Sequence, residues 1–333
     1  MFKIVRYSIY VLLLLCVSCA KQQQSSRPSC LPFDADSAYA YIHQQMAFGA
    51  RVPGSPEHEA CGDWLMHQLS RHGAQVKEQI GTILNYSGQL QAVRNIVGYW
   101  QGTLGHTIML CAHWDTRPWT DEEPDYADRF DPVPGANDGA SGVGVILEIV
   151  RQMQVFKAQG KPIPSLQIVF FDCEDMGTPT HYTGKQREHT WCLGSQLWAR
   201  DYRQAIANQL PTQPAILYGI LLDMVGDPSA TFPREYFSTM YASGYVEKIW
   251  RTAAQLGYAR YFVQQATLYP ITDDHYYVNT LAGIPCVDII DYKGGTETGF
   301  PEWWHTRADD MQNINKQTLQ AVGETVLTTI CSK

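Results

Sequence analysis

The sequence predicts an α/β fold with three layers, in which helices cover both faces of a mostly parallel central sheet. Two observations carry this prediction. Strand-like segments alternate along the chain with segments of helical periodicity, as they do where crossover helices join parallel strands. Several of the strand-like segments are apolar on both faces, which is typical of strands buried inside a sheet.

The first eighteen residues are predicted to be an export signal that lies outside the folded protein. Lys3 and Arg6 give the segment a positive start. Residues 9–17 then form an apolar run that is too short to cross a membrane as a mature helix. These features together are typical of a secretory signal peptide.

The end of this segment resembles the lipobox of bacterial lipoproteins, because the small residue Ser18 precedes Cys19. The resemblance implies a signal peptide of residues 1–18, a lipid-bearing Cys19, and a flexible polar tether over residues 19–32. The protein is therefore expected to be exported and lipid-anchored to a bacterial cell-envelope membrane, facing the periplasm or the surface. Cys16 stands where the lipobox usually has Leu, so cleavage by an ordinary signal peptidase nearby and an uncleaved anchor remain alternatives.

Residues 33–333 are predicted to form one domain, because neither an internal repeat nor a linker follows residue 32. Two amphipathic helices are predicted first, at residues 34–46 and 56–72. Three strands follow, at residues 75–80, 92–99 and 106–112. The third of these is apolar on both faces and is therefore expected at the centre of the sheet.

From residue 141 onward, helices and strands alternate. The apolar spacing predicts helices at residues 141–153, 194–207, 243–256 and 315–330. Apolar runs predict strands at residues 166–171, 215–222 and 286–290. This alternation is the pattern that indicates parallel strands with helices packed on both faces.

Charge and cysteine content exclude several classes of protein. The net charge of −8, without a basic run, argues against a nucleic-acid partner. Outside the export segment seven cysteines remain, an odd number without CxxC spacing, which excludes a zinc ribbon. Most are expected to be buried thiols. A single disulfide stays open, and its partners cannot be chosen from the sequence.

Polar side chains gather where apolar strands end or helices begin. Parallel strands end at one edge of a sheet, so these side chains are expected to lie together. The residues are His113 and Asp115, Asp138, Glu174 and Asp175, Asp223, and His305. Histidines and carboxylates are ligands that zinc accepts, and the set predicts a metal site at this edge.

In this order, the same residues resemble the co-catalytic zinc aminopeptidase superfamily over roughly residues 35–332. The expected fold is accordingly aminopeptidase/phosphorylase-like. Within the superfamily, three features are similar to the animal-type glutaminyl cyclases, a branch shared with certain bacterial lipoproteins. They are Leu222-Asp223, the run Thr272-Asp273-Asp274-His275, and Trp304 immediately before His305.

The resemblance implies a role for each matching residue. Asp138, Asp175 and His305 would bind one zinc ion, with Glu174 as the general acid and base. Asp223 and Asp273 would form an acidic hydrogen-bonded partner set, and Trp191 and Trp304 would line the substrate pocket. His113 and Asp223 match the second-metal ligands of the aminopeptidases, so a second zinc stays open.

Three departures from the animal enzymes stand out. Asp175 replaces a Glu, which shortens the ligand arm. Asp288 replaces a His, which leaves its role open. Residues 176–190 are a longer segment that is expected to form a loop over the pocket.

The favoured function is a zinc-dependent glutaminyl-peptide cyclotransferase, acting on peptides or proteins that begin with glutamine. The α-amine of such a substrate attacks its own γ-carbonyl and expels ammonia, which needs a polarised carbonyl and a nearby base. A secreted two-zinc aminopeptidase of the same fold is the first alternative. A peptide-binding lipoprotein without turnover is the second, although it has no need of Glu174 among the ligands.

Overall fold

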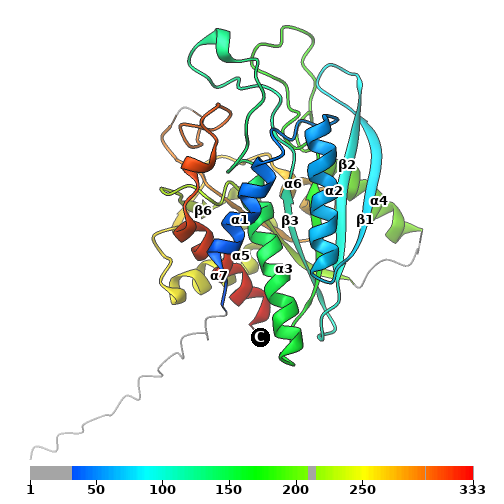
Figure 1. Ribbon diagram of the computed structural model, residues 1–333, viewed down its shortest axis with the longest axis vertical. Helices are drawn as coiled ribbons and strands as arrows, with labels where there is room; N and C mark the ends of the chain where they lie inside the picture. The colour runs from blue at the N-terminus through cyan, green and yellow to red at the C-terminus, as the bar shows by residue number, and fades with distance from the viewer. Residues whose placement is uncertain (1–31, 209–214, 297, 333) are drawn as a thin grey trace, which may run out of the picture.

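A six-stranded sheet with the order β1-β2-β4-β3-β5-β8 lies at the centre of the protein (Figure 1). The computed structural model describes residues 32–208, 215–296 and 298–332. The strands are β1 (Gln75–Leu84), β2 (Leu90–Trp100), β3 (Thr107–His113), β4 (Ser165–Phe171), β5 (Ile216–Asp223) and β8 (Cys286–Ile290). β3, β4, β5 and β8 run parallel, whereas β2 pairs antiparallel with β1 and β4. The predicted α/β class with a mostly parallel sheet is confirmed.

The central strands are buried on both faces. Every residue of β3 and β4 is inaccessible to solvent, which explains their continuous apolar sequences. Alternate side chains of β3 enter different cores, because successive side chains of a strand point to opposite faces. Ile108 and Leu110 belong to a large core on one face, and Met109 and Cys111 belong to a smaller core on the other.

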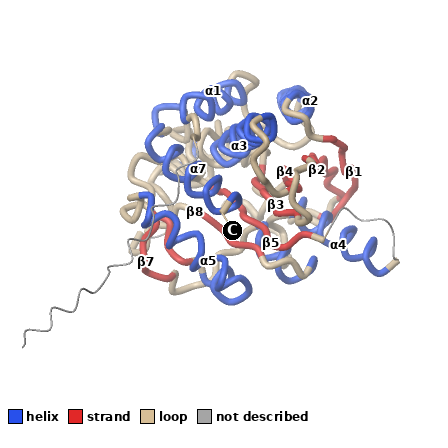
Figure 2. The backbone as a smooth tube through the Cα atoms, turned by 90° about the horizontal axis from the view of Figure 1, so that it is seen from below, coloured by secondary structure: helices blue, strands red, loops and turns tan. Residues whose placement is uncertain are grey.

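Helices cover both faces and complete the three layers. The larger core is built against α1 (Ala35–Met46), α2 (Pro56–Arg71), α3 (Ala140–Ala158), α5 (Tyr236–Leu256) and α7 (Lys316–Cys331). The smaller core is built against α4 (Leu193–Ala207), the short α6 (Asp274–Tyr277) and a π-helical turn (Val278–Ala282). Figure 2 shows α1 and α3 on one side of the strands and α4 on the other.

Some elements differ from the prediction for local reasons. α5 begins at Tyr236 rather than at residue 243, because Glu235 caps its first turn by accepting hydrogen bonds from Phe237 N and Ser238 N. Ala242 interrupts the helical dihedrals with φ −136°, which hides the first turns from a periodicity analysis.

The two-stranded sheet of β6 (Phe232–Arg234) and β7 (Phe262–Ala266) was not predicted, nor was α6. β6 and α6 are too short to show a period, and β7 is largely exposed and lacks the apolar run that marks β8. The two short 3₁₀ turns, Tyr126–Asp128 and Met311–Asn313, were also not predicted, because they too are short.

The six cysteines in the described part of the chain are free thiols. Cys30 lies outside that part, as do residues 1–18 and all but the last residue of the tether. None of the helices that the structure describes has the length and apolar character needed to span a membrane.

The parallel strands all end at the same edge of the sheet. β3 ends at His113, β4 is followed at once by Asp172, and β5 ends at Asp223. This edge therefore brings together the segments in which the sequence predicts the metal site.

Candidate active site

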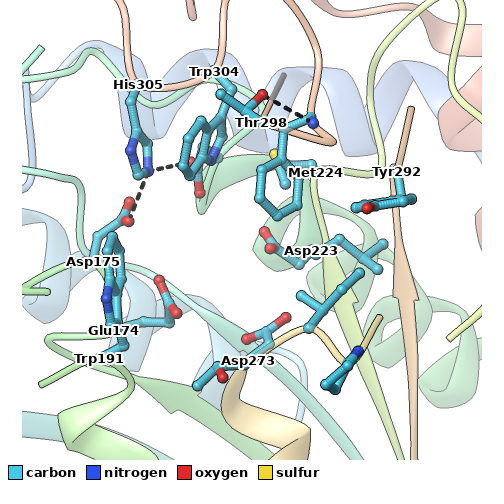
Figure 3. Close-up of a pocket in the computed structure, with 16 residues that line it drawn as sticks. Glu174, Asp175, Trp191, Asp223, Met224, Asp273, Tyr292, Thr298, Trp304 and His305 are labelled. Atoms are coloured by element: carbon cyan, nitrogen blue, oxygen red, sulfur yellow. Dashed lines mark hydrogen bonds and ion pairs between the residues drawn. The ribbon is translucent and has the colours of Figure 1, made fainter. Parts of the chain in front are cut away.

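A cavity of about 340 Å³ lies at this edge of the sheet (Figure 3). Its wall contains the side chains that were predicted as catalytic, substrate-lining and single-zinc residues: Asp138, Glu174, Asp175, Trp191, Asp223, Asp273, Trp304 and His305. The rest of the wall is largely apolar, with Ile271, Ile290 and Phe300 among its members. A few polar groups in an otherwise apolar hollow are typical of a site for a small organic group.

Asp138, Asp175 and His305 converge from three separate loops. His305 Nε2 lies 3.1 Å from Asp175 Oδ1 and 3.5 Å from Asp138 Oδ2. All three side chains are buried. Two ligands of a tetrahedral zinc, each about 2.0–2.2 Å from the ion, are about 3.4 Å apart, so this spacing suits one shared ion.

The buried oxygens of this group support the same assignment. Asp138 Oδ2 and Asp175 Oδ2 have no hydrogen-bond partner among the described residues. Buried carboxylate oxygens are normally paired, because an unpaired one loses its hydration without compensation. A divalent cation would supply the missing partner, and one imidazole with two carboxylates is a donor set that zinc accepts. The residues present therefore fit zinc.

Left-handed backbone occurs at several residues of the site. His305 has φ 55° and Met224 has φ 49°, and both border the cavity. Cys192 has φ 56°, and its thiol donates to Glu174 Oε1 over 3.1 Å. Such dihedrals in residues with a Cβ cost about 1–3 kcal/mol each and persist where the surroundings impose them.

The loop that carries Asp138 is held from behind by another buried carboxylate. Asp309 Oδ1 accepts a hydrogen bond from Asn137 N (2.8 Å), and Asp309 Oδ2 accepts one from Asp138 N (3.0 Å). Gly139 follows with φ 98°, and a Cβ there would lie 2.7 Å from Asp115 O and 3.1 Å from the His113 ring. Only glycine lets the loop pack this closely.

The Asp309→Asn substitution is expected to weaken zinc binding about tenfold while leaving the fold intact. An asparagine accepts through one oxygen only, so one of the two backbone hydrogen bonds to the loop is lost and Asp138 is less firmly placed. Competition with a chelator of known zinc affinity measures the effect. Asp310→Asn is the matched control, because Asp310 accepts only from its own 3₁₀ turn, through Gln312 N and Nε2. Equal zinc affinities of the two variants would show that Asp309 does not position the ligand.

Asp115 holds the loop after β4 in the same way. Its Oδ1 accepts a hydrogen bond from Glu174 N (3.1 Å) and its Oδ2 accepts one from Asp175 N (3.2 Å). The two consecutive carboxylates are thereby fixed at the backbone. Asp175 faces His305, whereas Glu174 faces the open cavity (Figure 3).

The surroundings of Glu174 and Asp175 shift the pKa values of the two side chains in opposite directions. Burial raises the pKa of Glu174 well above its usual range, and the adjacent Asp175 raises it further. Burial also acts to raise the pKa of Asp175, but His305, His113 and Arg117 together outweigh it and lower that pKa to about 2. Because the pKa values of the two carboxyl groups are shifted in opposite directions, Glu174 is suited to carry a proton and Asp175 to remain an anion. A bound cation would favour the ionised form of both.

His113 and Asp223 also reach this cluster. His113 Nε2 lies 2.9 Å from Asp138 Oδ1 and 3.3 Å from Asp223 Oδ1. Neither ring nitrogen makes a hydrogen bond of good geometry with a described residue. Burial alone would lower the pKa of His113, but the surrounding carboxylates of Asp115, Asp138 and Asp223 raise it well above its usual value. The second ligand pair predicted from the sequence is thus brought together in space.

Aromatic rings flank the metal ligands. The ring of Trp304 stacks on the His305 ring, with the two centroids 3.5 Å apart. The ring of Trp191 lies parallel to the His305 ring, with centroids 6.0 Å apart. The Arg117 guanidinium lies 4.7 Å from the Trp191 ring centroid and donates a hydrogen bond to Asp175 O. Arg117 is itself buried and paired with Asp121 through two hydrogen bonds of 2.6 Å. The two tryptophans are thereby held beside the ligands.

Asp273 faces the cavity as predicted, but its hydrogen-bond partner differs from the prediction. One oxygen accepts from Asp274 N, and Asp273 Oδ2 has no partner among the described residues. The expected hydrogen bond to Asp223 is absent from the described part of the chain, and an Asp273 oxygen lies within 4.8 Å of a Glu174 oxygen. Burial, with the Asp223 charge nearby, raises the pKa of Asp273 to about 7. A protonated Asp273 would be able to donate to either neighbour.

Behind Asp273 lies a buried polar group that joins His275 and Asp288, both noted in the sequence, to Glu235, which the sequence did not single out. His275 Nε2 lies 2.9 Å from Glu235 Oε2, and His275 Nδ1 lies 3.5 Å from Asp288 Oδ2. Asp288 is fully buried, and burial raises its pKa well above its usual range. The group therefore supports the segment that carries Asp273. Glu235 is the N-cap of α5, His275 lies in α6 and Asp288 lies in β8, and no local pattern in the sequence connects them.

Arg117, Cys192 and Asp309 are further site residues that the sequence analysis missed. Each makes a hydrogen bond to a predicted residue. Arg117 donates to Asp175 O, the Cys192 thiol donates to Glu174 Oε1, and Asp309 accepts from Asp138 N. Their only sequence signal is a charged or polar residue in a loop beside a predicted ligand or aromatic. Many surface residues share that feature, so it could not have singled them out.

Comparison with known proteins gives a consistent set of relatives. Residues 95–330 match peptidase family M28. A glutaminyl-peptide cyclotransferase of Bos taurus is 26% identical over 293 residues, which cover 81% of this chain and 74% of the relative. The structure of a glutaminyl cyclase from Tannerella forsythia is 46% identical with a TM-score of 0.82, covering 90% of this chain and 99% of its own. A zinc-dependent exopeptidase from Parabacteroides distasonis is 44% identical with a TM-score of 0.83, covering 91% of this chain and 100% of its own.

Proposed function

The chain belongs to peptidase family M28, and within that family we propose that it is a zinc-dependent glutaminyl-peptide cyclotransferase. The observation that carries this function is the cavity itself, in which Glu174 shares one wall with Asp273, Trp191 and Trp304 beside the zinc ligands. The similarity to proteins named glutaminyl cyclases supports it over aminopeptidase activity.

Each residue has a definite task in the reaction. Asp138, Asp175 and His305 would hold a zinc ion, which when bound would provide a Lewis acid for the γ-carbonyl of an N-terminal glutamine. Glu174 takes a proton from the neutral α-amine as the nitrogen attacks the γ-carbonyl carbon, so the ring nitrogen keeps one hydrogen. The new carbon–nitrogen bond closes the ring. Glu174 then returns its proton to the amide nitrogen, which leaves as ammonia.

The remaining side chains hold the substrate in the reactive conformation. The rings of Trp191 and Trp304 confine the glutamine, because flat apolar surfaces limit the conformations of its methylene groups and exclude water. Water exclusion matters because hydrolysis of the amide would compete with cyclisation. Asp273, 3% exposed, is placed to bind the attacking nitrogen or the leaving amide.

Purified protein is expected to release ammonia and a pyroglutamyl product from a glutamine-initiated peptide, and no free leucine from a leucine-initiated one. A chelator should abolish the release, and added zinc should restore it, because the ligands fit that ion. Ammonia measurement and mass spectrometry provide the readout. Release of leucine without loss of ammonia would instead identify an aminopeptidase.

The aminopeptidase alternative has one specific observation in its favour, the convergence of His113 and Asp223 on Asp138. In an aminopeptidase, His113 and Asp223 would complete a second zinc site, and Glu174 would activate the attacking water. Metal content separates the two functions: we propose one zinc per chain for the cyclotransferase. Two tightly bound zinc ions per chain would favour the peptidase.

We further propose that the protein is a lipoprotein of the bacterial cell envelope, anchored through Cys19 after removal of residues 1–18. The lipobox-like end of the export segment supports this proposal. Metabolic labelling with a fatty acid tests it, with Cys19→Ser as the comparison. Label that persists in the Cys19→Ser protein would contradict the anchor.

A further inference from the structure

A second cavity of about 320 Å³ adjoins the active site. The two cavities share Trp191 and Thr272 in their walls. The second cavity is lined mainly by polar side chains of the segment before α4, among them Arg187 and His189. Tyr277, at the end of α6, also lines the cavity, and its hydroxyl lies 3.1 Å from His189 Nδ1.

The position of this cavity suits the residues that follow an N-terminal glutamine. The glutamine side chain and α-amine occupy the first cavity, where the ligands and Glu174 lie. The rest of the peptide leaves from the glutamine carbonyl and has to pass a wall of that cavity. Trp191 and Thr272 belong to both hollows, so a chain that passes between them enters the second one.

The charges of the two cavities are opposite in sign. The first contains the carboxylates of Asp138, Glu174, Asp175, Asp223 and Asp273. The second has no carboxylate in its wall. Arg187, which lines the second cavity, makes neither an ion pair nor a hydrogen bond within the described part of the chain.

Arg187 is exposed, and within the described part of the chain it has no partner of opposite charge. Its Nη1 lies against the turn between β1 and β2, where a Cβ on Gly88 would be 3.2 Å away. Its N–H donors make no hydrogen bond to a described residue, and the exposed side chain can reach a ligand. A guanidinium in this state is suited to carboxylates, which it binds with two parallel hydrogen bonds.

We propose that the second cavity is a subsite for the peptide chain downstream of the glutamine, and that Arg187 makes it select acidic side chains. The inference rests on the cyclotransferase function and narrows its substrates to peptides and proteins in which aspartate or glutamate closely follows glutamine. Basic residues at the same positions are disfavoured by Arg187.

Three amidated peptides test the inference: Gln-Glu-Glu-Ala, Gln-Ser-Ser-Ala and Gln-Lys-Lys-Ala. The wild-type protein is expected to cyclise the acidic peptide with about tenfold higher kcat/KM than the basic one. Arg187→Gln should raise KM for the acidic peptide about two- to fivefold with kcat unchanged, because a solvent-accessible ion pair contributes modest, uniform binding. High salt should reduce the wild-type preference by screening the same interaction.

Lys185→Gln is the matched control, since it removes the same charge from the same segment at a residue outside the cavity wall. This variant should keep the wild-type preference. A wild-type protein that cyclises the three peptides equally well would overturn the subsite, and so would an Arg187→Gln variant that keeps the preference. If none of the three peptides released ammonia, the cyclotransferase function itself would be contradicted.

Discussion

Glu174→Gln is expected to lower the rate of ammonia release by about 10²–10⁴ while preserving the fold and the bound zinc. Glutamine keeps the shape of the side chain but cannot take up a proton and return it. The backbone of the residue is held by Asp115, a contact that the substitution leaves in place. Zinc should remain because Asp175, not Glu174, faces His305.

Single-turnover assays with a glutamine-initiated peptide, together with zinc analysis and circular dichroism, check this expectation. Glu302→Gln is a suitable control, because Glu302 is an exposed glutamate in the loop before His305 and outside the cavity wall. The control should retain wild-type activity. Near-normal ammonia release by a folded, zinc-loaded Glu174→Gln protein would remove this residue from the mechanism.

Asp175→Asn is expected to fail in a different way, by losing zinc. An amide oxygen is a neutral and weaker ligand than a carboxylate, and the low pKa of Asp175, about 2, shows how strongly its surroundings favour the ionised form. Loss of an outer-shell partner alone costs about 10–100-fold in metal affinity or activity, so loss of a ligand charge should cost at least about 10². Activity should recover partly when zinc is added in excess.

Dialysis against zinc buffers of graded free concentration measures this shift. The same titration on Glu174→Gln provides the contrast, since that protein should bind zinc as the wild type does and yet stay inactive at saturating zinc. If Asp175→Asn were fully active at low free zinc, Asp175 would not be a ligand. If the two variants showed the same metal dependence, the division of roles between these neighbours would be wrong.

Much of the site was already determined by the order of polar residues along the chain. His113, Asp138, Glu174, Asp175 and Asp223 follow or interrupt apolar segments, and parallel strands place their ends at one edge. Helical and strand periods come from neighbouring residues, so the long elements were predicted at the right places, although α5 begins earlier and β1 and α3 end later than predicted. The α/β class follows from the same periodicity.

Tertiary structure decided what supports those residues and what surrounds them. Asp309 caps Asn137 and Asp138 across a sequence separation of 172 and 171 residues. His275 is paired with Glu235, 40 residues away. Contacts of this range are selected by packing of the whole chain, and nothing in the local sequence of either partner indicates the other.

The same distinction applies to the space around the site. The hydrogen-bond partner predicted for Asp273 was wrong, because residue identity does not determine the direction in which a buried carboxylate points. The second cavity arises where the segment before α4 meets Thr272 and Tyr277. Periodicity and strand ends are properties of consecutive residues and can be predicted from the sequence. Cavities and side-chain directions depend on how distant segments pack, and only the folded structure contains that information.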